Sequence, residues 1–317
     1  MVVSGLLIVA GFVALIFGAN WLVDGASALA KKYHISDLAI GLTIVAFGTS
    51  APELVVNAIA SYQGYSDIVL GNIIGSNNFN LFIILGIAGL IFPISVQSST
   101  VWREIPISLI AALILLILGN EIFISKLTEI SRYDGLILIV LFALFLLYVY
   151  KQMKTEESVI ITFESKSNAK IWILIAGGFA GLIAGGQLVV NNSIGLATTL
   201  GVSEKIIGLT IVAAGTSLPE LVTSVVAALK KNSDIAIGNV IGSNVFNILL
   251  ILSISSFIRP IHFNPNFNLD IAILIGGTLF LFIAMFTGKR KKLDRWEASL
   301  LLGFYLVYTV YLVLKEL

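Results

Sequence analysis

Long apolar runs separated by short polar turns fill the chain almost from end to end. A helix needs about 20 mostly apolar residues to cross a hydrocarbon core roughly 30 Å thick. Ten runs approach this length, and they predict membrane-spanning helices over residues 3–29, 38–62, 68–92, 105–118, 135–150, 171–198, 206–229, 235–257, 269–286 and 298–314. The pattern therefore predicts an all-α integral membrane protein with ten transmembrane helices.

Composition excludes the soluble domains that a length of 317 residues would otherwise allow. Hydrophobic residues make up 58% and charged residues 12% of the chain, against roughly 45–50% and about 25% in soluble proteins. The net charge of +1 gives no reason to expect nucleic acid, and nothing indicates an obligate protein partner. With no cysteine and two histidines, the chain offers no thiolate chemistry and too few histidines for a metal site. We expect no cofactor.

The chain is an internal duplication. Residues 35–82 align without a gap onto 202–249, and 27 of the 48 aligned positions are identical. Five predicted spans separate equivalent points, so the two copies should cross the membrane in opposite directions, as in many secondary transporters. We therefore expect two inverted five-helix repeats, over 1–150 and 171–317, joined by the polar linker 151–170.

Orientation follows from the basic residues in the loops, because cytoplasmic loops carry the excess of Lys and Arg. The side that holds both termini carries 5 of them, and the opposite side carries 14. We predict a multi-pass protein of the plasma membrane with both termini outside and the linker in the cytoplasm. The basic segment 289–295 is interpreted as a contact to lipid headgroups.

Two carboxylates fall near the middle of apolar runs, at equivalent positions of the repeats. Glu53 ends the segment GTSAPE, and Glu220 ends GTSLPE. Each costs about 2.5–3.5 kcal/mol on membrane-insertion scales, and no Lys or Arg lies within the two spans. Either both are protonated for packing, or they form a cation site in which the ion supplies the positive charge. Their repetition in register favours the cation site.

Prolines next to these carboxylates predict broken helices near the membrane midplane. Pro52 has no N–H and should leave the Gly48 carbonyl without its helical partner, and Pro219 does the same for Gly215. The glycines loosen the same turns. Unpaired backbone at membrane depth is tolerated only where it faces protein or a cavity. Candidate carbonyl ligands are therefore those of Ala46, Gly48, Thr49, Ala213, Gly215 and Thr216.

The third and eighth spans carry the segments GNIIGSNNFN and GNVIGSNVFN, which supply neutral oxygens. Ser76 and Asn80 are four residues apart and share a helix face, as do Ser243 and Asn247, so these four are candidate ligands. Asn72, Asn77, Asn239 and Asn244 are either further ligands or hydrogen-bonding glue between helices. Oxygen ligands without His or Cys suit hard cations, and a flexible cage suits Ca²⁺ better than Mg²⁺.

The paired GTSxPE and GNxxGSNxxN segments resemble the two alpha-repeats of the calcium/cation antiporter superfamily, specifically its sodium/calcium exchanger branch. The resemblance implies an antiporter that exchanges Na⁺ for Ca²⁺ by alternating access, with the helices over 3–29 and 171–198 sliding against the rest. It implies a Ca²⁺ site formed by Glu53 and Glu220 with the carbonyls of Thr49 and Thr216. It also implies Na⁺ sites at Glu53, Glu220, Ser50, Ser217, Ser76, Ser243 and the carbonyls of Ala46 and Ala213, with Asn80 and Asn247 at the centre.

Several alternatives remain beside this interpretation. Some family members, including potassium-dependent ones, carry Asp at the position of Asn247, which argues against K⁺ coupling here. A proton-coupled branch has an acidic residue in place of the Gly–Ser pair, and this chain has Ser76 and Ser243, yet H⁺/Ca²⁺ exchange remains an alternative because a midplane carboxylate can titrate. A cation channel is less expected, since channels assemble their filters across subunits. An intramembrane hydrolase would need a catalytic pair or cluster that the spans lack.

Weaker polar positions lie nearer the helix ends. Asp24 aligns with Asn191, and Asn20 aligns with Gln187. We expect these side chains to cap helices or to line an access path.

Overall fold

The computed structural model describes residues 2–120, 129–153, 167–199, 213–288 and 290–316. The first repeat contains α1 (Val2–Tyr33), α2 (Asp37–Ile40), η1 (Gly41–Val45), α3 (Ala46–Thr49), α4 (Ala51–Gln63), α5 (Ser66–Asn78), η2 (Phe79–Ile84), α6 (Leu85–Ile91), β1 (Ile94–Ser95), η3 (Thr100–Glu104), α7 (Ile105–Gly119), β2 (Glu129–Ile130) and α8 (Arg132–Met153). The second contains α9 (Asn168–Thr199), α11 (Ala213–Thr216), α12 (Leu218–Leu229), α13 (Ser233–Val245), η5 (Phe246–Ile251), α14 (Leu252–Ile258), β3 (Ile261–His262), η6 (Pro265–Phe267), α15 (Asn268–Ala284), β4 (Lys292–Leu293) and α16 (Arg295–Glu316).

The helices agree with the prediction of an all-α membrane protein. Among the described residues, seven helices are long and apolar enough to cross a membrane, and the bent pair Asp37–Thr49 and Ala51–Gln63 brings the number to eight. The two other predicted spans correspond to α16 and to α11 with α12; positions 206–212 of the latter lie outside the described residues. The ends of the expected linker are helical, since α8 reaches Met153 and α9 begins at Asn168, and its middle lies outside the described residues.

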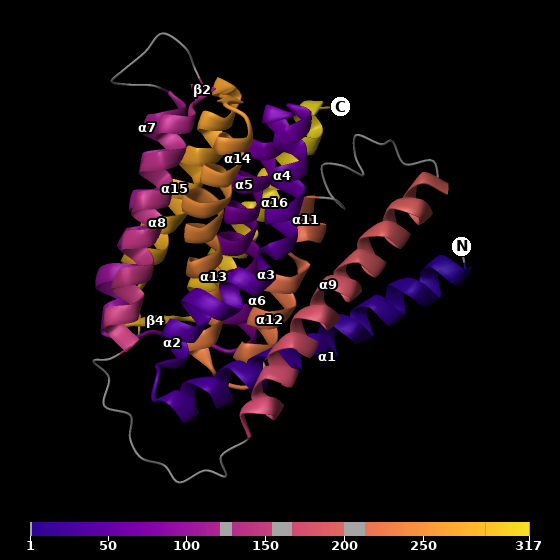
Figure 1. The fold of residues 1–317 in the computed structure, drawn as a ribbon, viewed down its shortest axis with the longest axis vertical. Helices are drawn as coiled ribbons and strands as arrows, with labels where there is room; N and C mark the ends of the chain where they lie inside the picture. The colour runs from indigo at the N-terminus through magenta and orange to yellow at the C-terminus, as the bar shows by residue number, and fades with distance from the viewer. Residues whose placement is uncertain (1, 121–128, 154–166, 200–212, 289, 317) are drawn as a thin grey trace.

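Two short antiparallel strand pairs are consistent with the inverted arrangement of the repeats. β1 pairs with β4, and β2 pairs with β3, so each pair joins a turn of one repeat to a turn of the other. β2 and β4 occupy equivalent positions in the two repeats, as do β1 and β3. Figure 1 shows β2 at one end of the bundle and β4 at the opposite end. Equivalent turns therefore lie at opposite ends of the molecule.

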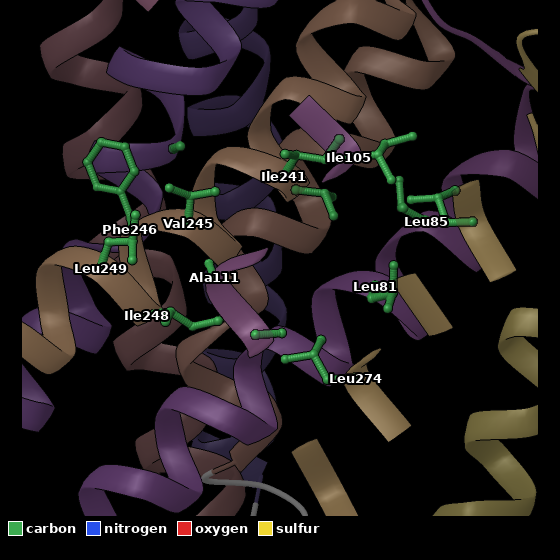
Figure 2. Packing of buried hydrophobic residues seen from close by; sticks show 14 of the residues in the cluster. Leu81, Leu85, Ile105, Ala111, Ile241, Val245, Phe246, Ile248, Leu249 and Leu274 are labelled. Carbon is green, nitrogen blue, oxygen red and sulfur yellow. The ribbon is translucent and has the colours of Figure 1, made fainter. Parts of the chain in front are cut away.

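The main core is built around the third and eighth predicted spans, which are the most buried of the candidate spans. The most apolar stretch of Ser66–Ile91 is 78% buried and that of Ser233–Ile258 is 94% buried, against 28–39% for the other long helices. Figure 2 shows their side chains packing with those of α7 and α15; labelled are Leu81, Leu85, Ile105, Ala111, Ile241, Val245, Phe246, Ile248, Leu249 and Leu274. The segments that carry the candidate asparagines are thus the centre of the fold.

Helices α1 and α9 form a separate packing unit beside this core. They run side by side at an angle to the other helices (Figure 1) and contribute most of the second cluster of buried side chains. A Cβ added at Gly18 would lie 2.8 Å from the Leu182 nitrogen, and one at Gly178 would lie 2.7 Å from the Leu22 nitrogen. Because glycine has no side chain, the two antiparallel backbones contact each other directly at these positions.

Candidate cation site

Both GTSxPE segments contain the predicted helix break. Ser50 separates α3 from α4 with φ −83° and ψ 5°, and Ser217 separates α11 from α12 with φ −88° and ψ 8°. The two halves of the first break meet at 48°. Pro52 and Pro219 lie in the first turn after the breaks, where a missing N–H is tolerated. The broken helices are therefore confirmed in both repeats.

The glycines of these segments have a second role that the sequence interpretation missed. A Cβ at Gly48 would lie 1.8 Å from Phe179 Cε1, and a Cβ at Gly215 would lie 2.3 Å from Val190 Cγ2. Phe179 and Val190 both belong to α9. The glycines thus let α9 press directly against both breaks.

The two breaks bring Glu53 and Glu220 into one buried site. Each carboxylate is 1% exposed and receives a hydrogen bond from the serine of the opposite repeat. Ser50 Oγ lies 3.0 Å from Glu220 Oε1, and Ser217 Oγ lies 3.3 Å from Glu53 Oε1. Because these bonds cross between repeats, neither half of the chain can form the site alone.

The asparagines divide into a connecting pair and an oriented pair. The Asn77 and Asn244 side chains each donate to the other's backbone carbonyl at 3.4 Å. Asn80 Nδ2 donates to Asn244 Oδ1, and Asn247 Nδ2 donates to Asn77 Oδ1, both at 3.0 Å. These bonds hold the amide nitrogens of Asn80 and Asn247 and leave their oxygens as the available atoms. Asn77 and Asn244 therefore act as structural connectors.

A set of buried oxygens in this region has no hydrogen-bond partner among the described residues. Buried unpaired polar atoms are rare in proteins and call for a specific explanation. Among the described residues, fifteen buried side-chain atoms are unpaired in this way, and five of them belong to the predicted site: Glu53 Oε2, Glu220 Oε2, Ser76 Oγ, Asn80 Oδ1 and Asn247 Oδ1. Carboxylate, hydroxyl and amide oxygens are the ligands that hard cations prefer. Two of these five oxygens belong to acids, Glu53 and Glu220.

Three further predicted residues lie around the breaks: Thr49 and Thr216, predicted as carbonyl ligands, and Ser243, predicted as a side-chain ligand. Thr49 donates its hydroxyl to Asn239 Oδ1 at 3.0 Å, and Thr216 donates to Asn72 Oδ1 at 3.3 Å. Ser243 Oγ lies 3.0 Å from Ser50 Oγ and 3.5 Å from Glu220 Oε1.

The carbonyls of Ala46 and Ala213 are the two predicted alanine ligands. The Ala46 carbonyl accepts from the Ser50 N–H at 2.9 Å, so this donor competes with an ion for it; the Thr49 hydroxyl, which donates to Asn239, also lies 3.3 Å away. Ala213 is the first residue of α11.

Sequence reasoning missed the two π-helical segments that carry the central amides. Asn80 is the second residue of η2, and Asn247 is the second residue of η5. Single π-turns inside α-helices occur frequently at functional sites, because the i→i+5 pattern shifts the direction of the side chains that follow. The sequence signal is limited to the Phe–Asn pair that opens both segments.

A cavity of about 310 Å³ reaches both breaks from α9. It is lined by Pro52, Thr216 and Pro219 at the breaks and by Gln187 and Asn191 of α9. This part of α9 lies beside the amino-terminal half of α1, where a Cβ on Gly11 would lie 2.8 Å from Val189. Gln187 and Asn191 thus line the cavity, as their expected role on an access path requires.

The equivalent face of α1 is closed in a different way. A cavity of about 460 Å³ there is lined by Asn20 and Lys230 and by residues of α12, without residues of the breaks. Lys230 Nζ makes a 2.8 Å ion pair with Asp24 and donates to the Asn20 carbonyl at 3.1 Å. The positions equivalent to Asp24 and Lys230 are Asn191 and Gln63, which carry no charge. The two sides of the site therefore differ in the structure.

These features define a class: a multi-pass membrane protein with two buried carboxylates and unpaired buried oxygens between two related halves. The family model described as Sodium/calcium exchanger protein matches residues 3–151 and 170–314. The chain belongs to this sodium/calcium exchanger family.

Individual relatives cover nearly the whole chain. Sodium/calcium exchanger MaX1 of Methanosarcina acetivorans is 33% identical over 352 residues, with 98% of each chain covered. Inner membrane protein YrbG of Escherichia coli is 32% identical, with 97% of this chain and 96% of that protein covered. A solved structure of the sodium-calcium exchanger NCX_Mj, soaked without Na⁺ and Ca²⁺, superposes with a TM-score of 0.85 at 31% identity and covers 98% and 100% of the two chains. These matches place the chain in a family of membrane transporters.

Proposed function

We propose that this protein exchanges Na⁺ for Ca²⁺ across the plasma membrane as a secondary antiporter. The observation that carries the proposal is the convergence of Glu53 and Glu220 with unpaired neutral oxygens in one buried site. No basic residue lies in the two spans, so a cation is the natural counter-charge. The names of MaX1 and NCX_Mj as sodium/calcium exchangers support the same ions.

Competition for the two carboxylates couples the ions. One Ca²⁺ or two Na⁺ balance the charge of Glu53 and Glu220, so bound Ca²⁺ and bound Na⁺ exclude each other. In the proposed site the Ca²⁺ is held by both carboxylates and the carbonyls of Thr49 and Thr216. The proposed Na⁺ ligands are Glu53, Glu220, Ser50, Ser217, Ser76, Ser243, Ala46, Ala213, Asn80 and Asn247.

Exchange of more than two Na⁺ for one Ca²⁺ would be electrogenic. The proposed Na⁺ ligands include neutral oxygens beyond the two carboxylates, at Ser76, Ser243, Asn80 and Asn247, so a further Na⁺ could bind there with a net positive charge. Electrogenic exchange is therefore part of the proposal. It predicts that a membrane potential alone, negative inside, changes the rate of Ca²⁺ movement.

Alternating access would come from the α1–α9 pair sliding on the remaining helices. The pair forms its own packing unit, its glycine contact is smooth, and α9 presses on both breaks. The cavity at Gln187 and Asn191 reaches the breaks from the side of the amino terminus, while Lys230 and Asp24 tie α1 to α12 on the other side. This asymmetry supports a conformation open toward the side of the termini.

The proposed orientation places that side outside the cell. It keeps the linker 151–170 in the cytoplasm between the repeats 1–150 and 171–317, with the excess of basic residues on the cytoplasmic side.

The test is ⁴⁵Ca²⁺ uptake into proteoliposomes loaded with Na⁺ and diluted into Na⁺-free buffer. Uptake that requires the Na⁺ gradient and stops when the gradient is collapsed supports the proposal. The matched sample carries a pH gradient without Na⁺. Uptake driven by pH alone would assign the protein to H⁺/Ca²⁺ exchange, and uptake that needs neither gradient would indicate a channel.

A further inference from the structure

A second cavity lies outside the cation site, between α15 and α16. Its volume is about 530 Å³, and its lining is apolar: Phe82, Ala272, Ile273, Gly276, Gly277, Phe280, Leu300, Leu301 and Phe304. Ala272, Gly276, Leu300 and Phe304 are exposed, so the cavity opens on the outer surface of the bundle. In a membrane protein this surface faces lipid.

The groove exists because α15 and α16 pack on different neighbours. α15 packs on α7 and α5, whereas α16 packs on α6 and η2. The Tyr308 hydroxyl donates to Asp270 and joins the two helices at one end, and the segment containing β4 joins them at the other. Phe82 of η2 forms the floor between them, stacked on Tyr305 with ring centroids 5.8 Å apart.

The groove lies at the depth of the acyl chains. From Ala272 to Phe280, the first and last residues of α15 that line it, the helix rises about 12 Å, within the roughly 15 Å of half a hydrocarbon core. Trp296 is 52% exposed at the start of α16, and exposed tryptophans gather at the headgroup level. The groove thus lies within the hydrocarbon core, about one helical turn from the interfacial end of α15.

A basic loop follows the interfacial end of α15, beyond the groove. Arg290 and Lys291 are exposed, and Lys292 is half-buried in β4. The loop is held in place, since the Lys291 N–H donates to the Met285 carbonyl and its own carbonyl accepts from the Val96 N–H, both at 2.8 Å. Arg295 is engaged with the Leu90 carbonyl at 3.0 Å and is not counted among the lipid ligands.

We propose that this groove binds one anionic phospholipid, with an acyl chain between α15 and α16 and its phosphate on Arg290, Lys291 and Lys292. Basic pockets between transmembrane helices are known sites for anionic headgroups. The acyl chain would contact Phe82, two residues from Asn80. The binding claim is independent of the ions transported.

Native mass spectrometry of the full chain in detergent tests the binding. The sample contains equal amounts of phosphatidylglycerol and phosphatidylcholine with the same acyl chains. The wild type should retain phosphatidylglycerol at least about tenfold more than phosphatidylcholine, since each basic residue near an anionic headgroup contributes roughly fivefold. Equal retention of the two lipids overturns the proposal.

Two glycines provide a matched pair of variants. A Cβ at either Gly276 or Gly303 meets no atom within 4 Å, and both residues lie within helices. Gly276 lines the groove, and Gly303 does not. Gly276→Leu should therefore lose the retained lipid, whereas Gly303→Leu should bind as the wild type does. Retention by Gly276→Leu at the wild-type level overturns the groove assignment.

The loop is tested separately, with variants that leave the groove intact. Replacing Arg290, Lys291 and Lys292 together by Gln should abolish the preference for phosphatidylglycerol while a lipid of either kind still binds. A variant that keeps the full preference overturns the headgroup assignment. Displacement of the lipid by inorganic phosphate alone would also contradict it, because the acyl chain supplies part of the binding.

Discussion

Replacing Glu53 by Gln removes one of two buried negative charges and little else. Gln has nearly the same size, and its side-chain oxygen can still accept the hydrogen bond from Ser217. Removing one charged partner of a buried ionic interaction costs about 3–5 kcal/mol. Since about 1.4 kcal/mol is a factor of ten, the affinity for Ca²⁺ should fall by roughly 10²- to 4 × 10³-fold. Glu220→Gln should behave in the same way because the site is nearly symmetric.

The same change should have the opposite effect on the protein without cations. Glu53 and Glu220 are both 1% exposed and carry like charges when ionised, so removing one charge relieves their repulsion. Thermal unfolding in a chelator should therefore occur at an equal or higher temperature than in the wild type. The stabilisation by Ca²⁺, which grows with the ratio of ion concentration to Kd, should disappear.

Glu104→Gln is the matched control for this experiment. Glu104 is also fully buried, but it lies in η3 and accepts a hydrogen bond from the Tyr148 hydroxyl, away from the two breaks. This variant should retain ⁴⁵Ca²⁺ transport and the thermal shift with Ca²⁺. Full exchange in both Glu53→Gln and Glu220→Gln would refute the site assignment.

Three further substitutions test separately the central amide, the contact between α1 and α9, and the ion pair between α1 and α12. Asn247→Asp adds a third acid at the centre, so cation selectivity or the pH dependence of ⁴⁵Ca²⁺ flux should change while the protein still folds; an unchanged pH profile and selectivity would contradict this. Gly18→Leu places a side chain where a Cβ already lies 2.8 Å from the backbone of α9, so transport should fall at least about tenfold, whereas Gly5→Leu, with no neighbour within 4 Å, should transport normally. Asp24→Asn breaks the ion pair with Lys230 and should change the transport rate by up to about fivefold without changing the Kd for Ca²⁺; a changed Kd would place this pair in the ion site.

The broken helices and their pairing follow from the sequence. A single proline inside an apolar run would not suffice, because prolines are frequent in membrane helices. Ser50, Pro52 and Glu53 recur at the equivalent positions of the second repeat. This repetition indicates that the same broken helix occurs in both repeats. Because an odd number of spans separates the copies, inversion follows from counting. The bonds from Ser50 to Glu220 and from Ser217 to Glu53 are what such an arrangement would produce.

The different roles of Asn77 and Asn80 could not be predicted from the sequence. Asn77 and Asn80 are three residues apart, and both are polar positions of one motif. The structure makes Asn77 a connector to Asn244 and leaves the Asn80 oxygen unpaired. The π-helical segment η2 begins between them and changes the direction of the following side chains. Its residues after Asn80 are all apolar, so no hydrophobic period marks the change.

The role of Gly48 depends on a contact that is remote in the sequence. A glycine before a proline indicates a weak point of a helix, and the helix does break at Ser50. The ring of Phe179 occupies the space where a Cβ on Gly48 would stand. A residue of α9, in the other repeat, therefore sets that requirement, and a single sequence does not reveal which helix approaches.

Equilibrium binding of ⁴⁵Ca²⁺ to the purified protein at increasing Na⁺ concentrations tests the central claim most directly. If Na⁺ and Ca²⁺ compete for Glu53 and Glu220, the apparent Kd for Ca²⁺ should rise with at least about the second power of the Na⁺ concentration, since two Na⁺ replace the charge of one Ca²⁺. Glu53→Gln should remove the high-affinity binding, and Glu104→Gln should keep both the binding and its Na⁺ dependence. A Kd for Ca²⁺ that does not change with Na⁺ would contradict the claim that the two ions share one pair of carboxylates.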